Sequence, residues 1–197
     1  MSNSTSEILT PLKQELSAID YQWVALESLS DIFCVLLAVY VALPGIRKLW
    51  PYHAGYAGTK KGFIWLAMTW GVANHAHLFR TIVGCVEVTI FAGCLMCFIP
   101  GPSWQLVTCT SLMLGIALCI SFMITHKSDP WRQILGIFRQ MTQAALALAI
   151  RLYQDFDWAD PSMTKPFLIA SIATGCGLLY MIYRRARYGK LPDPLLG

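Results

Sequence analysis

The stretch Arg80–Pro102, RTIVGCVEVTIFAGCLMCFIPGP, decides the fold of this chain. Between Arg80 and the Pro100-Gly101-Pro102 break lie nineteen residues, in which Glu87 is, cysteines aside, the one ionisable side chain. A run of this length and apolarity is typical of a membrane-spanning helix, which needs about 20 residues. A carboxyl group inside such a helix has to be neutral, paired or turned toward a polar interior. Glu87 is therefore a candidate functional residue.

The composition of the whole chain is that of a membrane protein. Of its 197 residues, 56% are hydrophobic and 13% are charged, whereas soluble domains carry roughly 25% charged residues. We therefore expect an all-α, polytopic membrane helical bundle in contact with the lipid bilayer. The net charge of +4 is spread among apolar segments, so the sequence does not indicate nucleic-acid binding.

Five hydrophobic segments predict five spans, with approximate bounds 32–46, 80–100, 104–125, 131–153 and 166–183. In the first of them, Pro44-Gly45 predicts a kink or an end of the helix. Residues 63–79 are also mostly apolar, and we expect an interfacial or re-entrant helix there. We divide the chain into an N-terminal amphipathic segment (1–28), a four-helix core (29–153), and an acidic loop, fifth span and basic tail (154–197).

The N-terminal segment carries an amphipathic pattern. Leu12, Leu16, Ile19 and Trp23 recur at spacings of four, three and four, which places them on one face of a helix. Two interpretations are open for this face. The helix lies along the membrane surface or on its own bundle, or it docks onto a partner protein.

The basic residues divide unequally between the two sides of a five-span arrangement. One side receives eleven, Arg47, Lys48, Lys60, Lys61, Arg80, Lys127, Arg132, Arg184, Arg185, Arg187 and Lys190, and the other receives Lys13, Arg151 and Lys165. If residues 63–79 were a further span, the basic residues would no longer be concentrated on one side of the membrane. By the positive-inside rule, the carboxyl terminus faces the cytosol or the mitochondrial matrix and the amino terminus lies outside. The membrane is then that of the endoplasmic reticulum or the mitochondrial inner membrane.

The depth of Glu87 predicts its partner. Glu87 and Arg139 both lie roughly 10 Å inside the basic side of their spans, so we expect an ion pair between them, with Gln140 or Gln143 completing its hydrogen bonds. Arg80 is a second candidate, because it lies on the same helix face as Glu87. This polar set is either an internal clasp that fixes helix packing or a polar pocket for a quinone, a lipophilic substrate or a proton.

The cysteines and histidines are the other candidates for metal binding or redox chemistry. The seven cysteines all fall in apolar segments, and we interpret most of them as small core residues. Cys94 and Cys97 share a helix face but lack a second pair for zinc, and His75 and His77 point to different sides of a helix. The sequence therefore predicts no metal site, identifies no cofactor and contains no recognisable catalytic constellation.

Several short motifs resemble those of a known family. They are Arg80-x3-Gly84-x2-Glu87-Val88, Phe98-Ile99-Pro100-Gly101-Pro102, His126 with Asp129-Pro130, and Gly45-Ile46-Arg47-Lys48-Leu49. Over residues 29–153 the chain resembles the DoxX-like superfamily, and within it the small transmembrane proteins related to the nicotinic acetylcholine receptor chaperone. The resemblance implies a four-helix membrane core whose members act as helpers or small subunits of membrane assemblies, and occasionally as parts of quinone-linked oxidoreductases.

Two functions follow as hypotheses. The first is a non-catalytic integral membrane helper, an assembly chaperone or an accessory subunit, with a membrane protein as its partner. The alternative is a small membrane-embedded enzyme or redox subunit that acts on a quinone or lipophilic metabolite through a polar pocket around Glu87.

Overall fold

The computed structural model describes residues 4–52, 63–64, 67–68, 70–125 and 131–188. This part of the chain is all-helical, as expected, with no strand. Its helices are α1 (Ser4–Leu49), η1 (Ala73–His75), α3 (Ala76–Leu95), η2 (Met96–Phe98), α4 (Pro102–Thr125), α5 (Trp131–Gln154) and α6 (Pro161–Tyr188).

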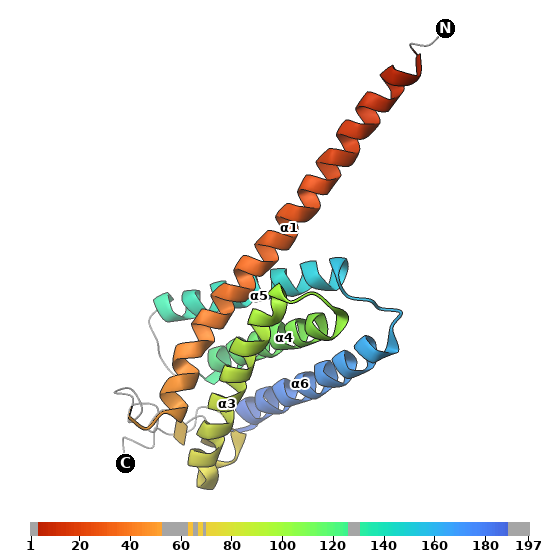
Figure 1. Cartoon of the computed structure of the whole chain (residues 1–197). Helices are drawn as coiled ribbons and strands as arrows, with labels where there is room; N and C mark the ends of the chain where they lie inside the picture. Colours follow the sequence, from red (N-terminus) through yellow and green to blue (C-terminus); the bar gives the residue numbers. More distant parts are fainter. Residues whose placement is uncertain (1–3, 53–62, 65–66, 69, 126–130, 189–197) are drawn as a thin grey trace.

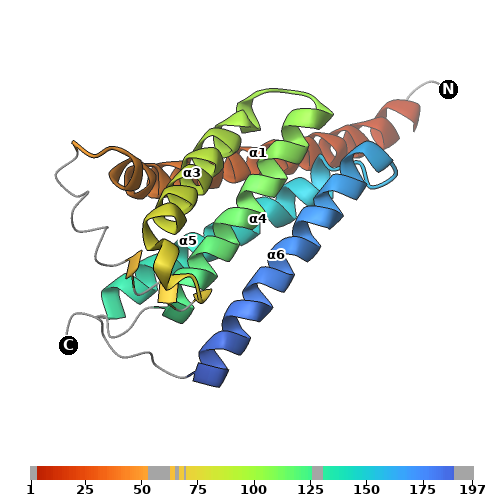
Figure 2. The same cartoon turned by 90° about the horizontal axis from the view of Figure 1, so that it is seen from below.

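Four helices form a closed bundle and the last one lies outside it. α1 packs against α3 and α5, and α4 packs against the same two helices from the other side. α6 packs against α4 (Figures 1 and 2). The chain therefore builds a four-helix core with a peripheral C-terminal helix.

Four of the five α-helices are long and apolar enough to cross a membrane, over Tyr21–Leu49, Ala73–Phe98, Pro102–Ile124 and Pro161–Arg187. The chain is thus a multi-pass membrane protein. α5, the fourth of the five expected spans, does not meet the same criterion because its sequence is more polar. It lies along α1 and α4, which cover part of its surface.

α1 is longer than expected. It runs without interruption through the expected boundary at residue 28, and it does not end at Pro44-Gly45. Its 46 residues span about 69 Å, more than twice the roughly 30 Å of a bilayer core. Its N-terminal part projects well beyond the bundle (Figure 1).

The segment expected to be interfacial or re-entrant folds back onto the bundle where it is described. The Trp70 ring is tilted by 45° against the rings of Phe79, at 5.9 Å between centroids, and Tyr180 of α6, at 6.4 Å. Gly71 then turns the chain with φ of 76°, a conformation that favours glycine. The span that carries Glu87 begins after this turn.

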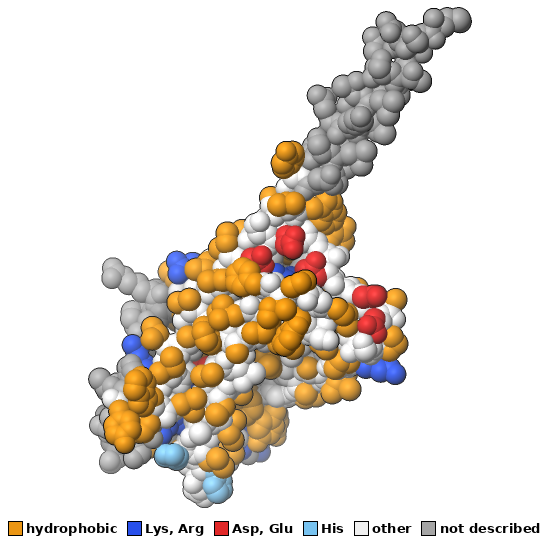
Figure 3. All heavy atoms as spheres, viewed as in Figure 1, with side chains coloured by type: hydrophobic (Ala, Val, Ile, Leu, Met, Phe, Trp, Pro, Cys, Tyr) orange, Lys and Arg blue, Asp and Glu red, His pale blue; other side chains and the backbone are white. Residues whose placement is uncertain are grey.

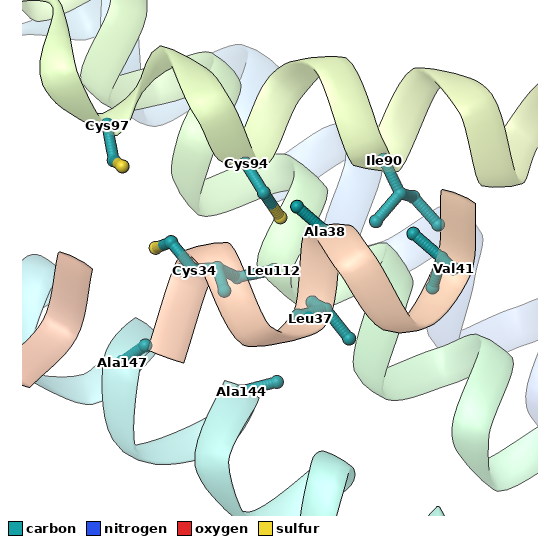
Figure 4. Packing of buried hydrophobic residues seen from close by; sticks show 10 residues of the cluster. All are labelled: Cys34, Leu37, Ala38, Val41, Ile90, Cys94, Cys97, Leu112, Ala144 and Ala147. Carbon is teal, nitrogen blue, oxygen red and sulfur yellow. The ribbon is translucent and has the colours of Figure 1, made fainter. Parts of the chain in front are cut away.

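The core is built from small and branched residues. Its largest buried cluster joins α1, α3, η2, α4 and α5 through Cys34, Leu37, Ala38, Val41, Ile90, Cys94, Cys97, Leu112, Ala144 and Ala147 (Figure 4). Small side chains at helix crossings let membrane helices approach closely. Five of the seven cysteines are buried and two, Cys85 and Cys176, are exposed, which agrees with their interpretation as mostly core residues.

The start of α6 is fixed by Asp160. Its carboxylate accepts hydrogen bonds of 2.8 Å from both the backbone N–H and the hydroxyl of Ser162, and Pro161 occupies the first helical position. This is the side-chain capping that satisfies free N–H groups at a helix start.

This cap predicts a pH dependence. The hydrogen bonds from Ser162 lower the pKa of Asp160 below its usual 3.8, so ionised Asp160 stabilises the folded state above that pH and the contribution is lost as pH falls through the folded pKa. We expect Asp160→Asn, which still caps but does not titrate, to lose less stability than wild type between neutral pH and pH 3. Thermal unfolding of both proteins across this range measures the difference. Parallel curves for the two proteins would contradict the assignment.

Candidate functional site

Glu87 is fully buried and has a basic partner, but the partner is Lys48. Lys48 Nζ lies 2.5 Å from each carboxylate oxygen of Glu87, and the two side chains are 5% and 1% exposed. The pair joins α1 to α3. A buried charge needs such a partner, because an unpaired one costs several kcal/mol.

Two glycines bring the helices close enough for this pair. Gly45 lies three residues before Lys48, and Gly84 lies three residues before Glu87. A Cβ on Gly45 would lie 3.1 Å from the Cβ of Glu87, and a Cβ on Gly84 would lie 2.9 Å from the Leu49 side chain. Both glycines thus sit in the crossing of α1 and α3. The Gly-x-x-Lys and Gly-x-x-Glu motifs of the two helices are therefore parts of one contact, which we call the Lys48–Glu87 clasp.

Aromatic rings surround the ammonium group of the clasp. Lys48 Nζ lies 5.4 Å from the ring centroid of Phe63 and 5.7 Å from that of Phe122. Ring faces attract a cation, and more strongly where water is excluded. The segment around Phe63 and helix α4 therefore contribute to the same site as α1 and α3.

The predicted pairing of Glu87 with Arg139 is wrong. Arg139 is exposed on the surface of α5, while the buried positions of that helix are Ile137, Gln140, Ala144, Ala147 and Arg151. Arg139 lies one residue from Gln140 and hence on another helix face. The prediction failed because it did not take the helix face of Arg139 into account.

The other predicted members of the polar set are at least partly buried. Gln140 is 6% exposed and Gln143 is half-buried, and the side-chain oxygens of both lack a hydrogen-bond partner among the described residues. Both oxygens of Glu87 instead accept hydrogen bonds from Lys48. Arg80 is also buried, and its Nη2 lies 3.2 Å from Nε2 of His77, one turn earlier on α3.

A second buried ionic cluster lies at the other end of the bundle and was not predicted. The Arg151 side chain is 2% exposed. Its guanidinium group pairs with Asp31 of α1, donates a 2.7 Å hydrogen bond to Gln105 Oε1 of α4, and lies 3.4 Å from Asp155 at the end of α5. Burial raises the pKa of the Asp155 carboxyl, against the opposing effect of Arg151. We call this set the Arg151 cluster.

The two charged sites mark opposite ends of the membrane bundle. Acidic side chains gather where α1 leaves the bundle (Figure 3). Glu27 and Asp155 line one surface hollow, and Asp31 and Asp155 both contact Arg151. α6 begins next to Asp160 and carries arginines in its last turn, at the other end of the bundle. The Arg151 cluster therefore belongs to the acidic end and the Lys48–Glu87 clasp to the basic end.

In both sites the charged side chains are neutralised by one another. In each, a cation from one helix is bonded to carboxylates supplied by other segments, so the groups bind one another and tie the helices together. Among the described residues there is no group of three or more His, Cys, Asp or Glu side chains placed to hold a metal ion.

Comparison of the chain with protein-family models, curated proteins and solved structures finds no match. The resemblance to the DoxX-like superfamily accordingly stays a prediction. The function has to be argued from the geometry of the bundle itself.

Proposed function

We propose that this chain is a non-catalytic integral membrane helper, an accessory subunit or assembly chaperone of a larger membrane protein complex. The observation that carries the proposal is the length of α1. The first seventeen residues of this helix, 4–20, amount to about 25 Å, and the N-terminal part of α1 projects beyond the bundle (Figure 1). Most helical stability in proteins comes from the packing of an amphipathic face against other segments, so a partner surface is expected to cover this part of α1.

The described part of α1 next to the projection offers contact residues. Tyr21 is 77% exposed and Val24 is 61% exposed. Trp23 stacks on Tyr153 of α5 at 5.8 Å between ring centroids, yet 40% of it remains exposed. Leu12, Leu16 and Ile19, predicted to share a face with Trp23, lie outside the described side chains. The docking face made by these residues is part of the proposal.

The internal pairing of both charged sites favours this function over the alternative. A membrane-embedded enzyme acting around Glu87 needs a carboxyl group that can reach a substrate. Glu87 is instead bonded to Lys48 through both oxygens. A clasp of this kind supports a rigid bundle that presents α1.

Removal of residues 1–20 tests the proposal. We expect the truncated chain to insert and unfold as the full chain does, and to lose a membrane protein that co-purifies in stoichiometric amount with the full chain. A photo-reactive amino acid at Val24 should cross-link that protein. The same probe at Ile169, which is 68% exposed on α6, is the matched control and should not.

Two results would contradict the helper function. One is a full chain that purifies without any stoichiometric protein and with a bound small lipophilic metabolite. The other is a partner that the truncated chain retains in the same amount.

A further inference from the structure

A groove runs along the outside of the four-helix core, between α3 and α6. It encloses a cavity of about 410 Å³, within the range of small-molecule sites. Both walls are helices that are long and apolar enough to cross a membrane. α4 lies between α3 and α6 (Figure 2), and its residues line the floor of the cavity. Its lining is mainly apolar and includes Trp70, Phe79, Leu118, Phe122, Thr174 and Gly177.

The basic end of the groove is closed by an aromatic residue with an arginine beside it. Trp70 lines the cavity, and its ring contacts those of Phe79 and Tyr180 in a tilted arrangement. The guanidinium group of Arg184 lies against the next residue, since a Cβ on Gly71 would come within 2.9 Å of Arg184 Nη2. A cation is therefore held at the point where the groove ends.

The α6 wall continues from apolar residues into arginines on one helix face. Thr174, Gly177 and Arg184 follow one another at spacings of three and seven, which keeps them on one side of the helix, and Arg187 lies next to Arg184 one turn later. Arg185 adds a further half-buried cation, and Arg187 is exposed. A molecule that fills the cavity and follows this face arrives at the arginines.

The length of this face matches one leaflet of a bilayer. From Ala173, the lining residue of α6 that is farthest along the helix from the arginines, to Arg184 is eleven residues, or about 16 Å. Half of the hydrocarbon core of a bilayer is about 15 Å. An acyl chain whose headgroup lies at the arginines would thus end beside Ala173.

We propose that the groove between α3 and α6 binds an anionic phospholipid, with an acyl chain in the cavity and the phosphate at Arg184 and Arg187. Guanidinium groups bind phosphate through paired hydrogen bonds. Basic residues at the end of a membrane groove favour anionic over zwitterionic headgroups by about 1 kcal/mol each. The lipid would also fill the space between α6 and the core, so that α6 is held by the lipid as well as by α4.

The test uses the full chain in detergent with added phosphatidylglycerol or phosphatidylcholine of identical acyl chains, and native mass spectrometry counts the retained lipids. We expect one retained phosphatidylglycerol and about a thirtyfold preference for it over phosphatidylcholine, which corresponds to about 1 kcal/mol from each of the two arginines. The double change Arg184→Gln, Arg187→Gln should abolish the preference. Arg47→Gln removes an exposed arginine from the end of α1 that lies at the basic end of the bundle. It is the matched control and should preserve the lipid preference.

Two further variants test the groove itself. Gly177→Leu fills the cavity, and a Cβ there meets just Trp70 at 3.9 Å, so the change is compatible with the backbone. Ala173→Trp at the exposed rim does not depend on core packing. Both should lose bound phosphatidylglycerol, whereas Cys176→Leu, on an exposed face of α6, should retain it.

Three outcomes would overturn the proposal. They are equal retention of the two lipids by the wild type, undiminished phosphatidylglycerol on both groove-filling variants, and a co-purifying neutral quinone that the same variants release. None of these bears on whether truncation of α1 releases a protein partner, so the two proposals fail separately.

Discussion

Replacement of Lys48 by methionine, with Glu87 kept, is expected to lower the free energy of unfolding by about 3–5 kcal/mol. The reason is that Glu87 is 1% exposed on its side chain and receives both of its hydrogen bonds from Lys48. Without the ammonium group the carboxyl group stays buried with no cation. Glu87→Met should destabilise by a similar amount, because it leaves the Lys48 cation buried.

The combination of the two changes should restore much of the lost stability. Two methionines of similar volume remove both charges together, and buried ion pairs replaced in this way are often neutral or stabilising. Unfolding of the single and double variants by titration with sodium dodecyl sulfate in mixed micelles measures each free energy. Arg47→Met, at the exposed neighbour of Lys48, is the control and should change stability by less than about 0.5 kcal/mol.

The double variant also separates the two functions. If the clasp is structural, a folded double variant keeps its protein partner. If it folds normally and loses the activity of the chain completely, Glu87 has a chemical role and the helper function fails.

The sequence predicted the membrane fold and the buried acid, because both depend on local composition. The nineteen residues between Arg80 and Pro100 are mostly apolar and include Glu87, and this pattern can be recognised without coordinates. The amphipathic nature of α5 could also be predicted from composition. Its polar residues indicated that part of this helix does not face lipid.

The partner of Glu87 was missed because Lys48 was assigned to the membrane surface together with Arg47. The spacing of buried residues along α1 could have identified Lys48 as a buried position. Buried positions on α1 follow Cys34, Ala38, Val41, Gly45 and Lys48 at spacings of four, three, four and three. Extending this period past Pro44 would have placed Lys48 on the inner face and Arg47 on the outer one.

The same helical period on α5 explains why Arg139 is exposed and why Arg151, which was not predicted, is buried. Gln140, Ala144, Ala147 and Arg151 follow one another at four, three and four residues and are all buried. Arg139 is outside this series, and Arg151 is inside it. Asp155 is four residues from Arg151 in the sequence, but Asp31 and Gln105 come from α1 and α4. Those two contacts depend on helix packing, which the sequence does not specify.

The second large effect is expected at the Arg151 cluster. Arg151→Met should lower the free energy of unfolding by about 3 kcal/mol, because it leaves Asp31, Gln105 and Asp155 without the cation that joins them. The loss is smaller than for the clasp, since the side chains of Asp31 and Asp155 are 27% and 25% exposed and remain partly hydrated.

Arg139→Met is the matched control for this change. It removes an arginine from the same helix, but an exposed one, and should alter stability by less than about 0.5 kcal/mol. The same titration in mixed micelles compares the two variants. Equal losses would mean that Arg139 is paired after all and that the helix face assigned to it is wrong. A negligible loss for Arg151→Met would instead show that α1, α4 and α5 are held at their acidic ends by apolar packing alone.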